Sequence, residues 1–413
     1  MDQSKMGVGL GIRGEFPMFS KGGDLGTLHY LDSAASSLKP RSVIERLSYY
    51  LSFQHANIHR GAYALSAGAT ELYHGARGTV AKFLNAASER SVVFTKGSTQ
   101  AINLVAHALE GEFKAGDTIL LTKLEHHSNI VPWQLLAKRR DIGVQFAEIR
   151  SDASLDVQDF KSKLQSERPK LVCFTSTSNA FGSIFPVQEL ISLAHSAGSW
   201  VLLDASQAVM HRRVDVQTLD ADFLVFTGHK IYGPTGIGVL YAKEELLERM
   251  QPFEGGGDMI AEVTTEGSTW AEYPRKFEAG TPPIAEAIGL GAALDFVSAI
   301  GLERIESHER KVFDYAWSLL SKEPGVKLYG PATNAGEQGP IVPFTIDGVH
   351  PHDFATVADS FGVQVRAGHH CAMPAMRALN LTATARASIG VYSMTSDFDA
   401  LLQAIQHAKR LFT

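Results

Sequence analysis

Short apolar runs, separated by polar turns and helical stretches, recur along the chain from about residue 90. The runs lie at residues 92–94, 119–121, 171–174, 201–203, 223–226 and 237–240. Each run is continuous rather than alternating, which is typical of strands buried on both faces of a parallel sheet. The repeated succession of strand and helix therefore predicts an α/β domain with a mostly parallel sheet.

The pattern changes after about residue 285. A long helical region is followed there by shorter predicted strands near residues 341–346 and 363–366, as in an α+β domain. We expect three parts in the chain. These are an N-terminal segment, residues 1–25, that packs with the small domain, a large domain, residues 26–285, and a small C-terminal domain, residues 286–413.

Polar residues gather directly after the predicted strands of the large domain. The stretches concerned are KGSTQ, TKLEHHSN, TSTSN, DASQ and TGHK. In open α/β sheets, ligands bind where the carboxyl ends of the strands meet. We therefore expect a ligand site at this edge of the sheet.

Three features of these stretches predict a cofactor. Gly97, Ser98 and Thr99 open a helix after a strand, where backbone N–H groups and hydroxyls favour an anion. Asp204 and Lys230 each follow a strand, and pyridoxal phosphate requires a lysine, an acid and a phosphate cradle. Taken singly, an ordinary N-cap or a solvated loop residue explains each feature, so the prediction rests on their combination.

The two cysteines of the chain have different surroundings. They are too few for a disulfide framework, so we expect reduced thiols in the cytoplasm. Cys173 lies in the apolar run LVCF and is predicted to be a buried core residue. Cys371 lies in the loop VRAGHHCAMP beside Arg366, His369 and His370, an electropositive setting that favours a thiolate. An exposed thiol without a role is the alternative.

Composition excludes several function classes. The formal charge is −6 and no basic run occurs, which argues against nucleic acid. No apolar run approaches the roughly 18 residues of a membrane span, and the N-terminus has no apolar core of secretory type. Gly9, Gly11 and Gly14 match G-x-G-x-x-G, but no strand precedes them, so a flexible terminus is expected. Neither the adjacent pair His126 and His127 nor the His369–Cys371 run has metal-site spacing, and we expect no metal.

The chain resembles one enzyme family along most of its length, from about residue 12 onward. The matching motifs, in family order, are YLDSAASSLKP, HRGAYALSAGAT, GSTQAINLVAH, LEHHSNIVPW, TSNAFG, LLDASQA, TGHKIYGPTGIGVLY, FEGGGDMI, FEAGTPP, RAGHHCAMP and ARASIG. They resemble those of Suf-type, or group II, cysteine desulfurases and selenocysteine lyases, in the class V branch of fold-type I pyridoxal-phosphate enzymes. The resemblance implies a homodimer, each subunit having a mostly parallel seven-stranded sheet and a smaller α+β C-terminal domain.

The same resemblance implies roles for individual residues. Lys230 would hold pyridoxal 5'-phosphate, while Asp204 would face its ring nitrogen, Gln207 its phenolic oxygen and His126 the face of its ring. Asn179 would lie beside cofactor and substrate. The implied phosphate ligands are Ser98, Thr99, Thr227 and His229, with Gly280 and Thr281 reaching the phosphate of the neighbouring subunit.

The implied activity is the conversion of L-cysteine to L-alanine. Arg386 would bind the substrate carboxylate, and Arg366 would support the cysteine loop. Lys230 would remove the Cα proton, and Cys371 would attack the substrate sulfur and keep it as a persulfide. That sulfur would pass to an acceptor protein of the Suf type for iron–sulfur cluster assembly. Asn103 and Arg60 are supporting residues in this interpretation.

Four positions depart from the family pattern. They are Gln100 for glutamate, Thr227 for serine, Met373 for glutamine and Pro283 for asparagine. None removes a reacting group, but Met373 lies two residues from Cys371 and bears on partner or substrate preference. Three alternatives remain. They are a selenocysteine lyase, a class V aminotransferase and a non-catalytic scaffold that binds a partner through the same cleft.

Overall fold

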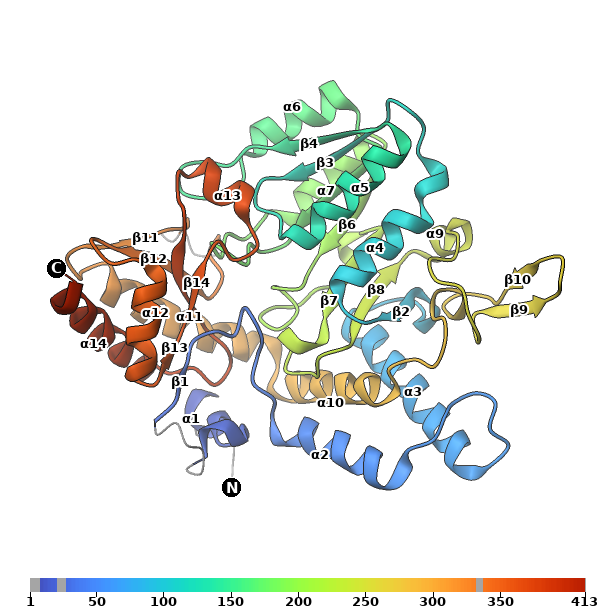
Figure 1. The fold of residues 1–413 in the computed structure, drawn as a ribbon, viewed down its shortest axis with the longest axis horizontal. Helices are drawn as coiled ribbons and strands as arrows, with labels where there is room; N and C mark the ends of the chain where they lie inside the picture. The colour runs from blue at the N-terminus through green and yellow to red at the C-terminus, as the bar shows by residue number, and fades with distance from the viewer. Residues whose placement is uncertain (1–7, 21–26, 332–336, 413) are drawn as a thin grey trace.

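A computed structural model of the protein describes residues 8–20, 27–331 and 337–412. A large sheet forms the centre of one region and a smaller sheet the centre of the other (Figure 1). Each sheet has a hydrophobic core against its own helices. The cavity described below lies where the two regions meet.

The large sheet has seven strands. They are β2 (Val92–Thr95), β3 (Thr118–Thr122), β4 (Gly143–Ala147), β5 (Leu171–Thr175), β6 (Trp200–Asp204), β7 (Phe223–Thr227) and β8 (Gly238–Ala242), in the order β2-β8-β7-β6-β5-β3-β4. All pairings are parallel except those of β8, which runs against both of its neighbours. The predicted mostly parallel seven-stranded sheet is confirmed.

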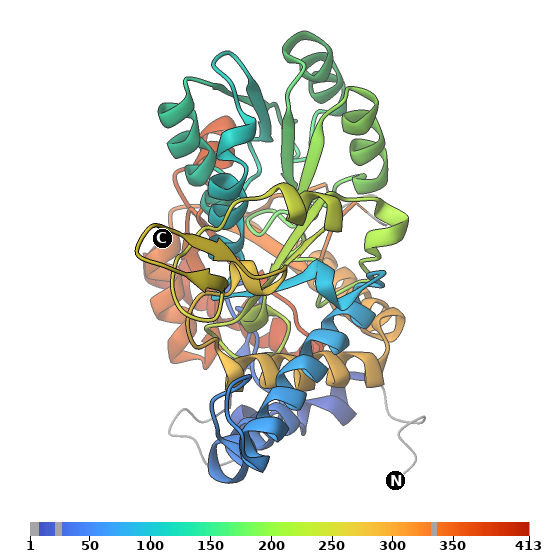
Figure 2. The ribbon, with the colours of Figure 1, turned by 90° about the vertical axis from the view of Figure 1, so that its right-hand side faces the viewer.

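Helices cover both faces of this sheet (Figure 2). On one face lie α4 (Ser98–Ala108), α5 (Val131–Arg140) and α9 (Glu244–Arg249), and on the other lie α3 (Ala64–Phe83), α6 (Val157–Glu167), α7 (Val187–Ser196) and α10 (Ile284–Ile300). Cys173 is fully buried in the core between the sheet and the helices α4, α5 and α9, as its apolar surroundings predict. Because both faces are covered, the carboxyl ends of the strands are left as the accessible edge.

The smaller sheet is antiparallel and has the order β11-β12-β15-β14. Its strands are β11 (Val326–Leu328), β12 (Ile341–Ile346), β14 (Arg366–Gly368) and β15 (Thr384–Ser388), and its helices are α11 (Leu302–Leu320), α12 (Pro351–Ser360) and α14 (Thr395–Phe412). The predicted strand at 363–366 is wrong as one element. Val363 and Gln364 form β13, which pairs with β1 (His29–Tyr30), and Arg366 begins β14.

The N-terminal part of the chain contacts the smaller sheet and its helices. Helix α1 (Val8–Arg13) contains two glycines of the G-x-G-x-x-G match, so this part is helical rather than the expected flexible terminus. The Arg13 guanidinium binds Asp397 in α14 at 2.9 Å and the Leu28 carbonyl at 2.8 Å. Residues 1–7 and 21–25 of the expected N-terminal segment lie outside the described residues. The domain boundaries therefore stay predictions.

The other elements connect these regions. They are η2 (Pro17–Phe19), α2 (Arg41–Tyr49), η3 (Tyr50–Gln54), η4 (Glu89–Ser91), η5 (Glu110–Glu112), η6 (His127–Asn129), α8 (Val216–Leu219), η7 (Gly228–Lys230), β9 (Ile260–Val263), β10 (Ser268–Trp270), η8 (Arg275–Phe277) and α13 (Met373–Ala378). The hairpin β9–β10 projects from the large sheet (Figure 1). Within the described ranges no single helix could span a membrane, and only the bent pair α10–α11 meets the length and composition required.

Candidate active site

A cavity of about 620 Å³ opens between the strand ends of the large sheet and the smaller sheet. The predicted site residues that line it are Ser98, Thr99, His126, Asn179, Asp204, Thr227, His229, Lys230, Arg366, Cys371 and Arg386. Four other predicted residues, Arg60, Gln207, Gly280 and Thr281, do not line it. The polar stretches after the strands therefore do converge, and one edge of the large sheet faces the cysteine loop.

The loop before α4 forms one end of the cavity. Gly97 precedes the helix, and Ser98 is its first residue. A Cβ atom at Gly238 in β8 would lie 2.4 Å from the Gly97 Cα, so only glycine allows these two backbones to approach so closely. The amides and hydroxyls at the start of α4 thus face the cavity, where the helix dipole favours an anion.

Lys230 and Asp204 provide an amine and a carboxylate in the same cavity. Burial lowers the pKa of Lys230 to about 8, although the charge of Asp204 opposes the shift. Asp204 ends β6, and its Oδ1 accepts the Ser206 N–H at 2.9 Å. The carbonyl of His229 accepts bonds from the Ser37 N–H at 3.0 Å and from Lys39 at 2.9 Å. The segment after β1 therefore fixes the backbone next to Lys230.

His126 presents a neutral ring to the cavity. Its Nδ1 accepts the backbone N–H of Ser128 at 3.1 Å, which leaves the ring proton on Nε2. Burial, reinforced by the charge of Lys230, lowers the pKa of His126 to about 3. An uncharged imidazole with a fixed tautomer can stack on an aromatic ligand and can donate a hydrogen bond through Nε2.

Arg386 is a fully enclosed cation on β15. It is 1% exposed, its Nη2 donates to Asp32 Oδ1 at 2.9 Å, and its Nη1 donates to the Asn179 carbonyl at 2.8 Å. Its Nε has no hydrogen-bond partner although it is buried. A buried guanidinium with an unpaired donor suits a carboxylate ligand.

Gln207 does not line the cavity, although its neighbour Ser206 does. Its Nε2 donates to the Ala34 carbonyl at 2.8 Å, and its Oε1 is buried without a partner. Ser206 Oγ, one residue earlier, is also buried and unpartnered. Together with Arg386 Nε, these atoms leave hydrogen-bonding capacity around the cavity that a polar ligand can satisfy.

The cysteine loop joins β14 to α13. Cys371 is partly exposed and lines the cavity, and its N–H donates to His369 Nδ1 at 3.1 Å. The carbonyl of His370 accepts from Asn179 Nδ2 at 2.6 Å. Burial lowers the pKa of His370 to about 2, so this ring beside the thiol is uncharged. Among the residues with described positions, no group of His, Cys, Asp or Glu side chains could hold a metal ion.

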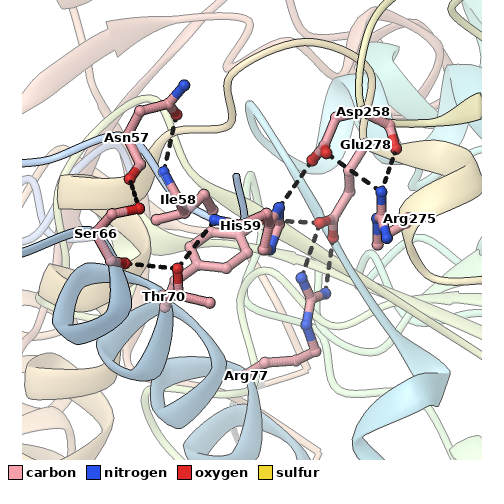
Figure 3. A network of polar contacts seen from close by, with 10 residues as sticks. Asn57, Ile58, His59, Ser66, Thr70, Arg77, Asp258, Arg275 and Glu278 are labelled. Atoms are coloured by element: carbon pink, nitrogen blue, oxygen red, sulfur yellow. Dashed lines mark hydrogen bonds and ion pairs between the residues drawn. The ribbon is translucent and has the colours of Figure 1, made fainter. Parts of the chain in front are cut away.

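Gly280 and Thr281 line a separate hollow of about 220 Å³, together with Arg60. A polar network lies beside this hollow (Figure 3). In it Asp258 bridges His59 Nδ1 at 3.0 Å and Arg275 at 3.3 Å. Within one chain, Gly280, Thr281 and Arg60 therefore lie apart from the main cavity. Asn103, the other predicted supporting residue, lines the main cavity.

Sequence reasoning missed two residues of the site. Asp32, which holds Arg386, follows a strand of only two residues, too short to be recognised as an apolar run. Glu125, which precedes His126, is fully buried, and its carboxylate accepts hydrogen bonds from Thr122 Oγ1 and Asn129 Nδ2. Burial raises its pKa to about 8, a property for which the sequence LEHHSN contains no signal.

Known proteins with this architecture identify the family. The model of the class-V aminotransferase family matches residues 29–401. The chain belongs to this family. A probable cysteine desulfurase of Synechocystis sp. is 45% identical over 403 residues, covering 97% of this chain and 96% of that protein. A cysteine desulfurase of Serratia proteamaculans is 43% identical over 402 residues, covering 97% and 98%.

The fold of this class-V family member also matches solved structures. The apo structure of cysteine desulfurase from Thermococcus onnurineus NA1 superposes with a TM-score of 0.90 at 38% identity and covers 97% of this chain and 98% of that chain. The cysteine desulfurase CsdA from Escherichia coli, solved in an S-sulfonic acid form, has a TM-score of 0.89 at 38% identity, with the same coverage. These likenesses confirm the predicted fold-type I architecture.

Proposed function

We propose that the protein is a pyridoxal-phosphate-dependent cysteine desulfurase, which converts L-cysteine to L-alanine and collects the sulfur as a persulfide on Cys371. One observation carries the proposal. A thiol, an amine of lowered pKa and a buried guanidinium, those of Cys371, Lys230 and Arg386, share a single cavity. An aminotransferase has no use for the thiol. The relatives named above as cysteine desulfurases support the same activity.

The cavity fits pyridoxal phosphate. Lys230 is the residue for covalent attachment, Asp204 for the ring nitrogen and His126 for the ring face. The start of α4, with Thr227 and His229, suits the phosphate. The family resemblance assigns the ring hydroxyl to Gln207, which lies behind the cavity lining and has a buried Oε1 without a partner. When bound, pyridoxal phosphate withdraws electrons from the Cα of an amino acid joined to it.

The residues of the chain then perform the reaction. Arg386 binds the carboxylate of cysteine and orients its Cα toward Lys230, whose neutral amine removes the Cα proton. The Cys371 thiolate attacks the substrate sulfur. An S–S bond forms, the Cβ–S bond breaks, and its electron pair stays with Cβ, which gains a proton to become the methyl group of alanine. The proton lost by the Cys371 thiol balances this gain, and Lys230 returns to Cα the proton that it removed.

Several finer assignments belong to the same proposal. The order of the motifs supports the Suf-type, or group II, subgroup and a sulfur-acceptor protein for iron–sulfur cluster assembly. A homodimer gives a use to Gly280 and Thr281, which would complete the phosphate site of the partner subunit. The three-part division of the chain and a cytoplasmic location remain predictions.

The test compares the native protein with Cys371→Ser and Cys173→Ser. After L-cysteine is added, we expect native protein and Cys173→Ser to form alanine and persulfide, because Cys173 is buried away from the cavity. Cys371→Ser should take up the cofactor, seen in its visible absorbance, but form no persulfide. Alanine formed at the native rate by Cys371→Ser would overturn the assignment.

The same variants separate the alternatives. Selenium release from selenocysteine by Cys371→Ser, together with failure on cysteine, would identify a selenocysteine lyase. Transfer of the amino group to an added keto acid would identify an aminotransferase. A protein that stays colourless with pyridoxal phosphate would favour the non-catalytic scaffold.

A further inference from the structure

His127 makes two hydrogen bonds to the cysteine loop, one to the thiol-bearing residue itself and one two residues beyond it. Its backbone N–H donates to the Cys371 carbonyl at 2.8 Å, and its ring Nε2 accepts the N–H of Met373 at 3.1 Å. We propose that His127 is a positioning residue that docks the loop against the large sheet, so that the Cys371 thiol lies in the cavity. The inference rests on the proposed function, in which this thiol must reach the substrate sulfur.

The two bonds join parts of the chain that are far apart in sequence. His127 follows His126 in the loop after β3, whereas Met373 begins α13 beyond the smaller sheet. Among the described residues, one other hydrogen bond joins the loop to the large domain, from Asn179 Nδ2 to the His370 carbonyl. Asn179 therefore holds the loop just before Cys371, and the His127 ring holds it just after Cys371.

The loop backbone depends on such outside contacts. His370 has φ of 51° and Cys371 has φ of 55°, in the left-handed region that side chains with a Cβ rarely adopt. A segment with two consecutive residues of this kind relaxes unless surrounding contacts hold it. Loss of the His127 ring bond should thus favour an undocked loop.

The His127 ring can accept this bond only while Nε2 carries no proton. The titratable groups facing it are His369, with ring centroids 5.6 Å apart, and His126, with ring centroids 6.3 Å apart. Burial, with a contribution from His369, lowers the pKa of His127. The surroundings therefore favour the neutral, accepting form.

The experiment measures the alkylation of Cys371 by iodoacetamide in the holoenzyme without cysteine. Cys173 is fully buried, so in native protein the mass gain reports on Cys371, and peptide mapping locates the label. His127→Leu removes the acceptor but keeps the backbone N–H, whereas His127→Gln restores an acceptor oxygen near the position of Nε2. Loss of one hydrogen bond corresponds to a change of about 2- to 10-fold in the docked population.

We expect His127→Leu to be alkylated faster by about this factor, and His127→Gln to react at close to the native rate. In turnover, His127→Leu should lower kcat for persulfide formation, while the cysteine concentration that half-saturates the absorbance change stays unchanged. If Cys371 in His127→Leu were alkylated at the native rate, the proposal would be overturned. A His127→Gln rate equal to that of His127→Leu would overturn it too, because ring packing would then be what matters.

A measurement on unmodified protein covers the case in which His127→Leu does not fold. Amide hydrogen exchange should show the Met373 N–H protected, and exchange at the rate of an unstructured peptide would contradict docking. Alkylation and exchange require no desulfurase activity. Failure of docking and failure of the proposed function are therefore distinguishable.

Discussion

At the scale of single residues, burial determines the protonation states around the cavity. It holds His126 and His370 neutral by lowering their pKa values, and it brings the pKa of Lys230 to about 8. The sequence located these residues because each lies beside a strand end or the cysteine. It could not indicate their protonation, which depends on how many atoms from distant segments exclude water. Asp32 was missed for a similar reason, because its importance comes from its contact with Arg386.

The lowered pKa of Lys230 predicts how cofactor attachment depends on pH. Only the neutral amine is a nucleophile, so the rate at which apo protein takes up pyridoxal phosphate should rise with pH and level off above about 8. Stopped-flow absorbance between pH 6 and about 10 tests this, since an unperturbed lysine has a pKa of about 10.4. A rate still rising steeply near pH 10 would show that burial does not set the pKa. Lys230→Ala is the control, in which covalent attachment is lost.

At the scale of elements, strand existence was easier to predict than strand direction. The apolar run at 237–240 belongs to β8, which is buried on both faces like the parallel strands but runs the opposite way. A continuous apolar pattern reports burial and not direction. Strand β4 was missed because it lies at the sheet edge and is mostly half-buried. Gly238, the first residue of this antiparallel strand, packs against Gly97, and this close approach positions the start of α4 at the cavity.

Gly238→Ala should therefore disturb the anion-binding end of the cavity. The new Cβ would lie 2.4 to 2.9 Å from backbone atoms of Gly97, so the loop before α4 must move. We expect a loss of about 1–3 kcal/mol in the free energy of unfolding and faster dissociation of pyridoxal phosphate during dialysis. Gly75→Ala in α3, where a Cβ would meet nothing within 4 Å, is the matched control. Equal cofactor retention in both variants would contradict the argument.

At the scale of the whole molecule, the site depends on contacts between segments that the sequence does not connect. The buried pair Arg77 and Glu278 is an example (Figure 3). Arg77 in α3 donates to both carboxylate oxygens of Glu278, and Glu278 also accepts the Phe94 N–H of β2 at 2.7 Å. One carboxylate thus joins a helix, an edge strand and the segment that leads to Gly280. Local patterns predict the elements but contain no signal for this junction.

Glu278→Gln should leave the Arg77 charge buried without its partner. Breaking a buried pair in this way costs about 3–5 kcal/mol in the free energy of unfolding, which urea denaturation would measure. The control is Glu272→Gln, which breaks an ion pair with Arg90. The Glu272 side chain is 87% exposed and the Arg90 side chain is 48% exposed. That change should cost no more than about 1 kcal/mol. Similar losses in the two variants would show that the buried pair is not specially stabilising.

The place of β8 in the sheet also constrains synthesis of the protein. Strand β2 forms one edge of the sheet and its neighbour is β8, so residues 92–95 have no strand to pair with until residues 238–242 leave the ribosome. Arg386 and Cys371 emerge later still. A nascent chain therefore exposes the Lys230 amine well before the groups that enclose it are made. Cofactor capture with the geometry described here is consequently an event that follows completion of the chain.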